Sequence, residues 1–181
     1  MPDRRTAAWV LALALPLLAA GCGDEDDGPP PAAPTPTEAL WNPCDGLDPR
    51  SLGKQLGAEV TEQHGTPTAP DCRFPPRAQG DPVLDANYML FPAGLDEAFE
   101  TMGRSRTATV TAPRVRGADD ARLVVEVDHR QLYVSGFVQN GDLIQTVNAV
   151  DPQPFDRRRL VRAVTWVLGE LAAHARDAGV S

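Results

Sequence analysis

Hydrophobic residues in the second half of the chain fall into three short runs with the composition of β-strands. The runs cover 123–127, 132–138 and 143–150, and each is rich in Val and Leu. A polar segment separates the first two runs, and Asn140-Gly141-Asp142 separates the last two. Because Asn-Gly between such runs is typical of a two-residue hairpin turn, the pattern predicts an antiparallel meander of three strands.

The segment before this meander predicts two more strands and a short helix. Alternation over 84–91 is typical of a strand with one face on a core, and Pro92 ends it. Apolar residues at helical spacing predict a helix within 94–103. The run 107–115 predicts a strand at a sheet edge, because Pro113 interrupts it and proline cannot donate to a ladder.

Another short helix is predicted near the start of this region. Asp48 followed by Pro49 is typical of a helix start, and Leu52 and Leu56 share one face before Gly57 ends the helix. A polar, proline-rich connection is then expected over 64–71, followed by a brief strand at 72–74.

A long helix is predicted at the C-terminal end. Asp156 is placed to cap a helix over 157–175, whose apolar residues form one stripe that must lie on the sheet. The stripe consists of Leu160, Val164, Val167, Leu168 and Leu171. For 41–181 the order of elements predicts an α+β domain: a single antiparallel sheet with a C-terminal meander, two short helices, and the long helix packed on the sheet.

The first 21 residues have the pattern of a secretory signal peptide. Arg4 and Arg5 precede an apolar run over 7–20, which is too short to cross a hydrocarbon core that needs about 20 helical residues. The run ends in Leu18-Ala19-Ala20-Gly21-Cys22, which resembles the bacterial lipobox. The resemblance implies that Cys22 is acylated and becomes the new N-terminus, so that the lipid anchors the protein to the membrane.

A linker is predicted between Cys22 and the domain. The segment 23–40 combines an acidic run with five prolines and has no apolar periodicity. An extended chain of this length spans roughly 55 Å at about 3.1 Å per residue. The segment 22–40 is therefore expected to be a tether that holds the domain at the extracytoplasmic face of the cell membrane.

Two cysteines remain once Cys22 carries lipid. Cys44 and Cys72 would lie in an oxidising compartment, so we expect them to form a disulfide that also pins Trp41 and the first helix. Neither cysteine has the paired spacing of a zinc site, and no metal is expected.

Charge limits the class of partner. The chain has 17 basic and 25 acidic residues, a formal net charge of -8, which is the wrong sign for an electrostatic grip on nucleic acid. No nucleic-acid partner is expected.

The segment around the two cysteines has a familiar pattern. It consists of Asn42-Pro43-Cys44-Asp45-Gly46-Leu47-Asp48, then Leu52 and Leu56-Gly57, then Cys72-Arg73-Phe74. With the lipobox and tether, this resembles a group of actinobacterial lipoproteins of unknown function. The architecture is also similar to the extracellular sensor domains of some mycobacterial serine/threonine kinases, although those carry a second disulfide. The resemblance implies a cell-surface lipoprotein and supplies no ligand or catalytic residue.

The three histidines are poor candidates for acid–base chemistry. His64 precedes a proline-rich loop, and His174 lies near the end of the last helix, where a cation suits the dipole. His129 follows Asp128 in a predicted hairpin turn, and we expect their side chains to point to opposite faces. No nucleophile motif, phosphate loop or dinucleotide motif is present, so neither enzyme activity nor a cofactor is expected.

One cluster of cations is unusual. Three arginines in the first turn of the long helix oppose its dipole, where anions are favoured. They suggest a site for an anionic partner; the alternative is that their stems pack over the sheet edge and pair with carboxylates. The cluster consists of Arg157, Arg158, Arg159 and Arg162.

Two classes of function follow. The first is a non-catalytic binding or interaction module, sensor-like in character, that meets an envelope polymer or an extracytoplasmic protein. The alternative is an envelope hydrolase or transferase whose site no motif reveals.

Overall fold

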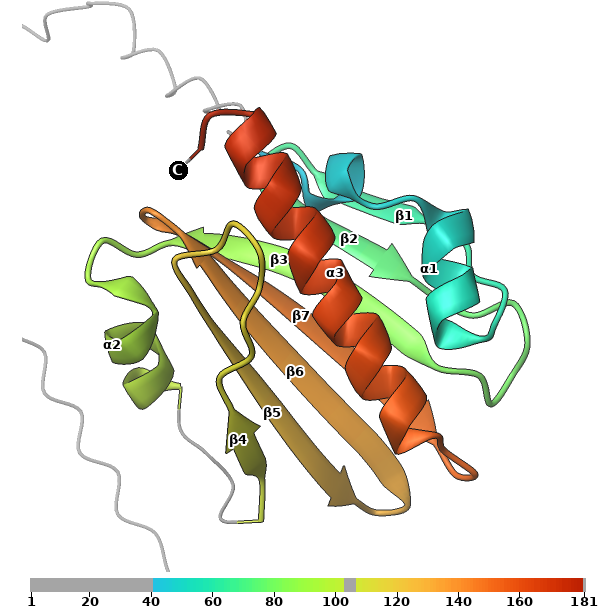
Figure 1. Cartoon of the computed structure of the whole chain (residues 1–181). Coiled ribbons are helices and arrows are strands. Elements are labelled where there is room, and N and C mark those ends of the chain that lie inside the picture. Colours follow the sequence, from blue (N-terminus) through green and yellow to red (C-terminus); the bar gives the residue numbers. More distant parts are fainter. Residues whose placement is uncertain (1–40, 103–106, 181) are drawn as a thin grey trace, which may run out of the picture. The chain divides into compact units, whose positions relative to one another are not determined.

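The computed structural model describes residues 41–102 and 107–180, and within them seven strands pair into one antiparallel sheet (Figure 1). The strand order is β1-β2-β3-β7-β6-β5-β4. The strands are β1 (Gln63–Thr66), β2 (Ala69–Phe74), β3 (Val83–Leu90), β4 (Thr109–Thr111), β5 (Asp120–Asp128), β6 (Gln131–Asn140) and β7 (Leu143–Pro152). The helices are the 3-10 turn η1 (Pro43–Gly46), α1 (Pro49–Leu56), α2 (Gly94–Thr101) and α3 (Arg157–Asp177).

This architecture confirms the predicted α+β fold. The meander is formed by β5, β6 and β7, which follow one another in the chain and in the sheet, and β3 pairs with the free edge of β7. The signal peptide, Cys22 and the tether predicted over 1–40 lie outside the described residues.

The long helix α3 lies diagonally across one face of the sheet (Figure 1). Its predicted stripe is fully buried, and Val164 and Leu168 pass directly over Gly136 of β6. A Cβ atom at Gly136 would lie 2.8 Å from Val164 Cγ1, so this close crossing requires glycine. No helix in the described ranges 41–102 and 107–180 is long and apolar enough to cross a membrane.

The buried side-chain amide of Gln145 links Trp41, the first described residue, to the core. Gln145 of β7 is completely buried, and its Oε1 accepts a hydrogen bond of 3.1 Å from the indole N–H of Trp41. Its Nε2 donates to the backbone oxygen of Leu171 in α3, also at 3.1 Å. Both polar ends of the glutamine are therefore satisfied, as burial demands.

The opposite face of the sheet has two different parts. The short helix α2 covers one end, where Leu95 and Phe99 pack on Phe137 and Ile144. A polar row crosses the neighbouring strands: Ser135 donates to Asn148 Oδ1 at 2.9 Å, and Asn148 donates to Asp85 at 3.2 Å.

The structure corrects the expectation of a connection over 64–71. This segment contains most of β1, which pairs with β2 in a short hairpin that places His64 opposite Cys72. Every residue of β1 except Gly65 is exposed, so β1 has no buried face and no apolar alternation to reveal it.

Two boundaries also differ from the sequence prediction. The edge strand expected over 107–115 is confined to β4, and the chain leaves the ladder before Pro113. Asn140 pairs with Leu143, so the residues that make the β6–β7 turn are Gly141 and Asp142 rather than Asn-Gly. Gly141 takes the positive φ (55°) that the first position of such a turn requires.

Candidate functional site

Helix α1 begins and ends at the predicted residues. The Asp48 carboxylate accepts the backbone N–H of Ser51 at 2.7 Å, and Pro49 occupies the first helical position. Hydrogen bonds from Ser51 hold the pKa of the Asp48 carboxyl below its ordinary value, because they favour its charged form. Gly57 ends the helix in the left-handed region, with φ of 71°.

The two faces of α1 have different roles. Leu52 and Leu56 are buried in the core beneath the helix. Arg50 and Lys54 lie four residues apart on the outer side, which places them on one face. The core contact therefore fixes the helix backbone that carries this pair of exposed cationic residues.

Two extended segments, 59–61 and 75–77, pair to form the other wall beside α1. The backbone N–H of Arg77 donates to the backbone oxygen of Glu59 at 2.8 Å, and the backbone N–H of Thr61 donates to the backbone oxygen of Pro75 at 3.0 Å. The chain after α1 also passes very close to the helix, since a Cβ atom at Gly53 would lie 2.8 Å from the Ala58 carbonyl oxygen.

Between these walls lies an open groove of about 920 Å³. Arg50, Lys54 and Arg77 supply three cationic side chains to its lining, and Glu59 and Glu62 supply two carboxylates. The groove is therefore locally cationic although the whole chain is strongly acidic. This is the candidate site, and we call it the α1 groove.

The structure places one arginine of the predicted cluster at the edge of the α1 groove. A Cβ atom at Gly57, which lines the groove, would lie 2.6 Å from Arg159 Nη1, so the guanidinium rests against this glycine. Arg159 also lies 3.5 Å from the Asp156 carboxylate. The backbone N–H of Arg159, more than its charge, keeps the pKa of Asp156 below its ordinary value.

The other three members of the cluster are separate from the groove lining. Arg157, Arg158 and Arg162 are exposed, and none forms an ion pair with a carboxylate in the described part of the chain. Pairing with carboxylates, the alternative weighed for the whole cluster, therefore applies to Arg159 alone.

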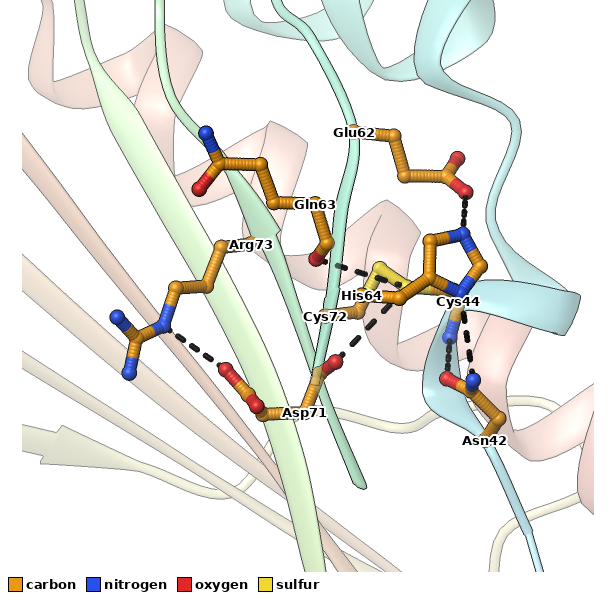
Figure 2. The surroundings of a disulfide bond; sticks show 8 residues. All are labelled: Asn42, Cys44, Glu62, Gln63, His64, Asp71, Cys72 and Arg73. Atoms are coloured by element: carbon orange, nitrogen blue, oxygen red, sulfur yellow. Dashed lines mark hydrogen bonds and ion pairs between the residues drawn. A yellow bond between two sulfur atoms is a disulfide. The ribbon is translucent and has the colours of Figure 1, made fainter. Parts of the chain in front are cut away.

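The predicted disulfide is present. Cys44 of η1 and Cys72 of β2 are joined with an S–S distance of 2.03 Å, and both residues are buried (Figure 2). The bridge fastens the segment before α1 to the sheet, as expected.

His64 has partners that its place in the sequence did not suggest. Its Nε2 contacts the Glu62 carboxylate, and its Nδ1 lies 3.4 Å from Asn42 Nδ2 (Figure 2). The Asn42 amide is oriented because its Oδ1 accepts the N–H of Cys44 at 3.0 Å. Asn42 therefore directs an N–H toward His64 Nδ1, and Nδ1 accepts it. In the neutral ring the proton then lies on Nε2, which faces Glu62.

The remaining histidines occupy different surroundings. His174 stacks on Trp41 with 3.9 Å between ring centroids, beside a cavity of about 420 Å³ that His64 also lines. The expectation that Asp128 and His129 point to opposite faces is wrong, since their side chains are 2.6 Å apart. His129 has left the strand, with φ of 44°, and strand alternation does not apply to it.

The cations of the α1 groove were missed at the level of sequence. The i,i+4 spacing of Arg50 and Lys54 on a short amphipathic helix is a usable signal for a shared face. Nothing local connects Arg77 to them, because its position depends on pairing with a segment 18 residues away.

Comparison with known proteins gave no match to a family model, to a curated protein or to a solved structure.

Proposed function

We propose that the protein is a lipid-anchored, non-catalytic binding module of the cell envelope that takes an anionic ligand in the α1 groove. One observation carries the proposal: three cations of an acidic chain converge on a single groove, with Arg159 at its edge. A group of cations with carboxylates in the minority attracts anions, whereas the rest of the acidic surface repels them.

The chemistry of the groove favours a ligand with several negative groups. Arginine offers a planar fork of donors that matches phosphate and carboxylate, and lysine adds a point charge. Arg50 and Lys54 come from successive turns of α1 and Arg77 comes from the opposite wall, so both walls of the groove carry cations. A polymer with repeated phosphate or carboxylate groups would meet them together.

The predicted N-terminal segments fit this role. Cleavage after Gly21 and acylation of Cys22 would hold the protein on the extracytoplasmic face, and the tether over 22–40 would let the domain reach envelope polymers or an extracytoplasmic protein.

Binding of inorganic polyphosphate to the purified mature chain tests the groove. The double variant Arg50→Glu and Lys54→Glu should weaken binding by about tenfold or more, from two lost charge contacts and new repulsion. Arg158→Glu with Arg162→Glu is the matched control, because it changes the formal charge equally outside the groove. Equal losses in the two variants would contradict the proposal.

A second candidate function is an envelope hydrolase that uses His64 as a base. The contact of His64 with Glu62, beside a cavity of about 420 Å³, favours it. Turnover of an envelope ester, peptide or glycan by the purified protein, abolished by His64→Ala, would replace binding as the function. The same assay on His129→Ala addresses the Asp128 contact.

A further inference from the structure

Three potential metal ligands from two parts of the chain meet beside the disulfide. Cys44 Sγ, a Glu62 carboxylate oxygen and a His64 ring nitrogen all lie within 4.8 Å of one another. Figure 2 shows Glu62 and His64 beside the sulfur of Cys44. Glu62 and His64 are two positions apart on an extended chain, so they point to the same side.

The oxidised protein lacks one of these ligands. The sulfur of Cys44 is bonded to Cys72, and a metal ion needs the thiolate. The donor set is therefore complete only after the disulfide opens.

We propose that reduction of the Cys44–Cys72 bridge creates a zinc site made by Cys44, Glu62 and His64. A dithiol reductant of the thioredoxin class supplies two electrons and two protons, both cysteines become thiols, and the reductant becomes a disulfide. Zn²⁺ then displaces the proton of the Cys44 thiol, while water fills the fourth position. The site shares Glu62 with the lining of the α1 groove, but the inference does not rest on anion binding there.

The geometry suits a tetrahedral ion after a small adjustment. Zinc distances of about 2.3 Å to sulfur and about 2.0–2.2 Å to nitrogen or oxygen put neighbouring donors roughly 3.4–3.6 Å apart. Cys44 Sγ lies within 4.8 Å of the other two donors and must approach them, whereas His64 Nε2 and the Glu62 carboxylate are already in contact and must separate to admit the ion. The His64 side chain is 50% exposed and Glu62 has three rotatable bonds, so rotation can supply this movement.

The two cysteines are not equivalent in this proposal. Cys72 is completely buried on β2, and its sulfur is not part of the donor group. Removing either cysteine abolishes the disulfide, yet only removal of Cys72 leaves the thiol beside Glu62 and His64. The two variants therefore form a matched pair.

Co²⁺ and Zn²⁺ titrations of the mature chain carrying Cys72→Ser or Cys44→Ser test the site. We expect Cys72→Ser to bind one ion at least about 100-fold more tightly than Cys44→Ser. Loss of a residue that only hydrogen-bonds to a metal ligand costs up to about 100-fold in affinity, and loss of a ligand itself should cost no less. The cobalt form should show thiolate-to-cobalt absorption. His64→Ala in the Cys72→Ser background should remove both the affinity and the absorption, and equal binding by the two single variants would overturn the proposal.

The wild-type chain supplies a second measurement that does not depend on either variant folding. Without reductant it should bind no cobalt at this site, and with a phosphine reductant it should bind one ion while circular dichroism shows a folded domain. A reduced wild-type chain that binds no cobalt, or that unfolds, would refute a reduction-dependent site.

Discussion

The crossing of α3 over Gly136 predicts a specific packing defect in Gly136→Ala. The new methyl carbon would lie 2.8 Å from Val164 Cγ1 and 3.0 Å from Leu168 Cδ1. Carbon atoms prefer about 3.5–4.0 Å, so both neighbours must move by about half an ångström or more. Val164 is β-branched and has one favoured rotamer in a helix, so its side chain cannot rotate away and the backbone of α3 must shift.

The expected magnitude follows from this overlap. Overpacking of a core costs about 1–3 kcal/mol, while Gly→Ala recovers about 0.4–1 kcal/mol by restricting the unfolded chain. The free energy of unfolding should fall by a net of about 1–2 kcal/mol. For a domain of this size, that corresponds to a Tm lower by roughly 3–8 °C.

Urea denaturation of Gly136→Ala, Val164→Ala and the double variant tests the steric cause. The free energy of unfolding of the double variant should exceed the value expected from adding the two single changes by at least about 0.5 kcal/mol, because the smaller residue at 164 makes space for the new methyl group. Gly169→Ala is the control: beyond its chain neighbours and the adjacent helix backbone, no atom lies within 4 Å of the added Cβ, so it should stabilise α3 by up to about 1 kcal/mol. Additive effects, or a stabilising Gly136→Ala, would refute the reasoning.

Three further predictions concern the disulfide, a buried acid and the anchor. The bridge spans a sequence separation of 28 residues, so its reduction should lower the free energy of unfolding by about 3.6 kcal/mol in urea titrations, and a loss below about 1 kcal/mol would contradict this estimate. Burial raises the pKa of the Asp151 carboxyl, because the charged form is poorly solvated in the folded state. The folded protein is therefore more stable while Asp151 is protonated, and it loses this stability as pH rises through the folded-state pKa. Relative to the wild type, Asp151→Asn should gain stability between about pH 3 and pH 7, and a difference that is flat across this range would be the wrong outcome. Cys22→Ala should release the protein from membranes or leave an uncleaved precursor in cell fractionation, whereas normal processing with retained membrane binding would exclude the lipid anchor.

Elements with strong local signals could be predicted from the sequence. Asp48, Pro49 and Gly57 define α1 because capping and the left-handed helix end depend on a few adjacent residues. The stripe of α3 is equally local, since five apolar residues at helical spacing determine which face meets the sheet.

Features made by contacts between distant segments could not be predicted in this way. Strand β1 is held by its pairing with β2, not by apolar alternation. In the α1 groove, a backbone hydrogen bond to Glu59 positions Arg77, and Arg159 of α3 lies against Gly57. Each of these contacts depends on the tertiary fold, and local periodicity carries no information about them.

The location of a bound anion tests the central claim most directly. Amide chemical shifts of the ¹⁵N-labelled mature chain can be followed while short-chain polyphosphate is added at low salt. We predict that the largest changes cluster on the α1 groove, at Arg50, Lys54, Glu59 and Arg77, and that they diminish as salt rises because screening weakens the contacts. Changes confined to the cavity beside His174, or no changes in the groove at saturating polyphosphate, would contradict the account.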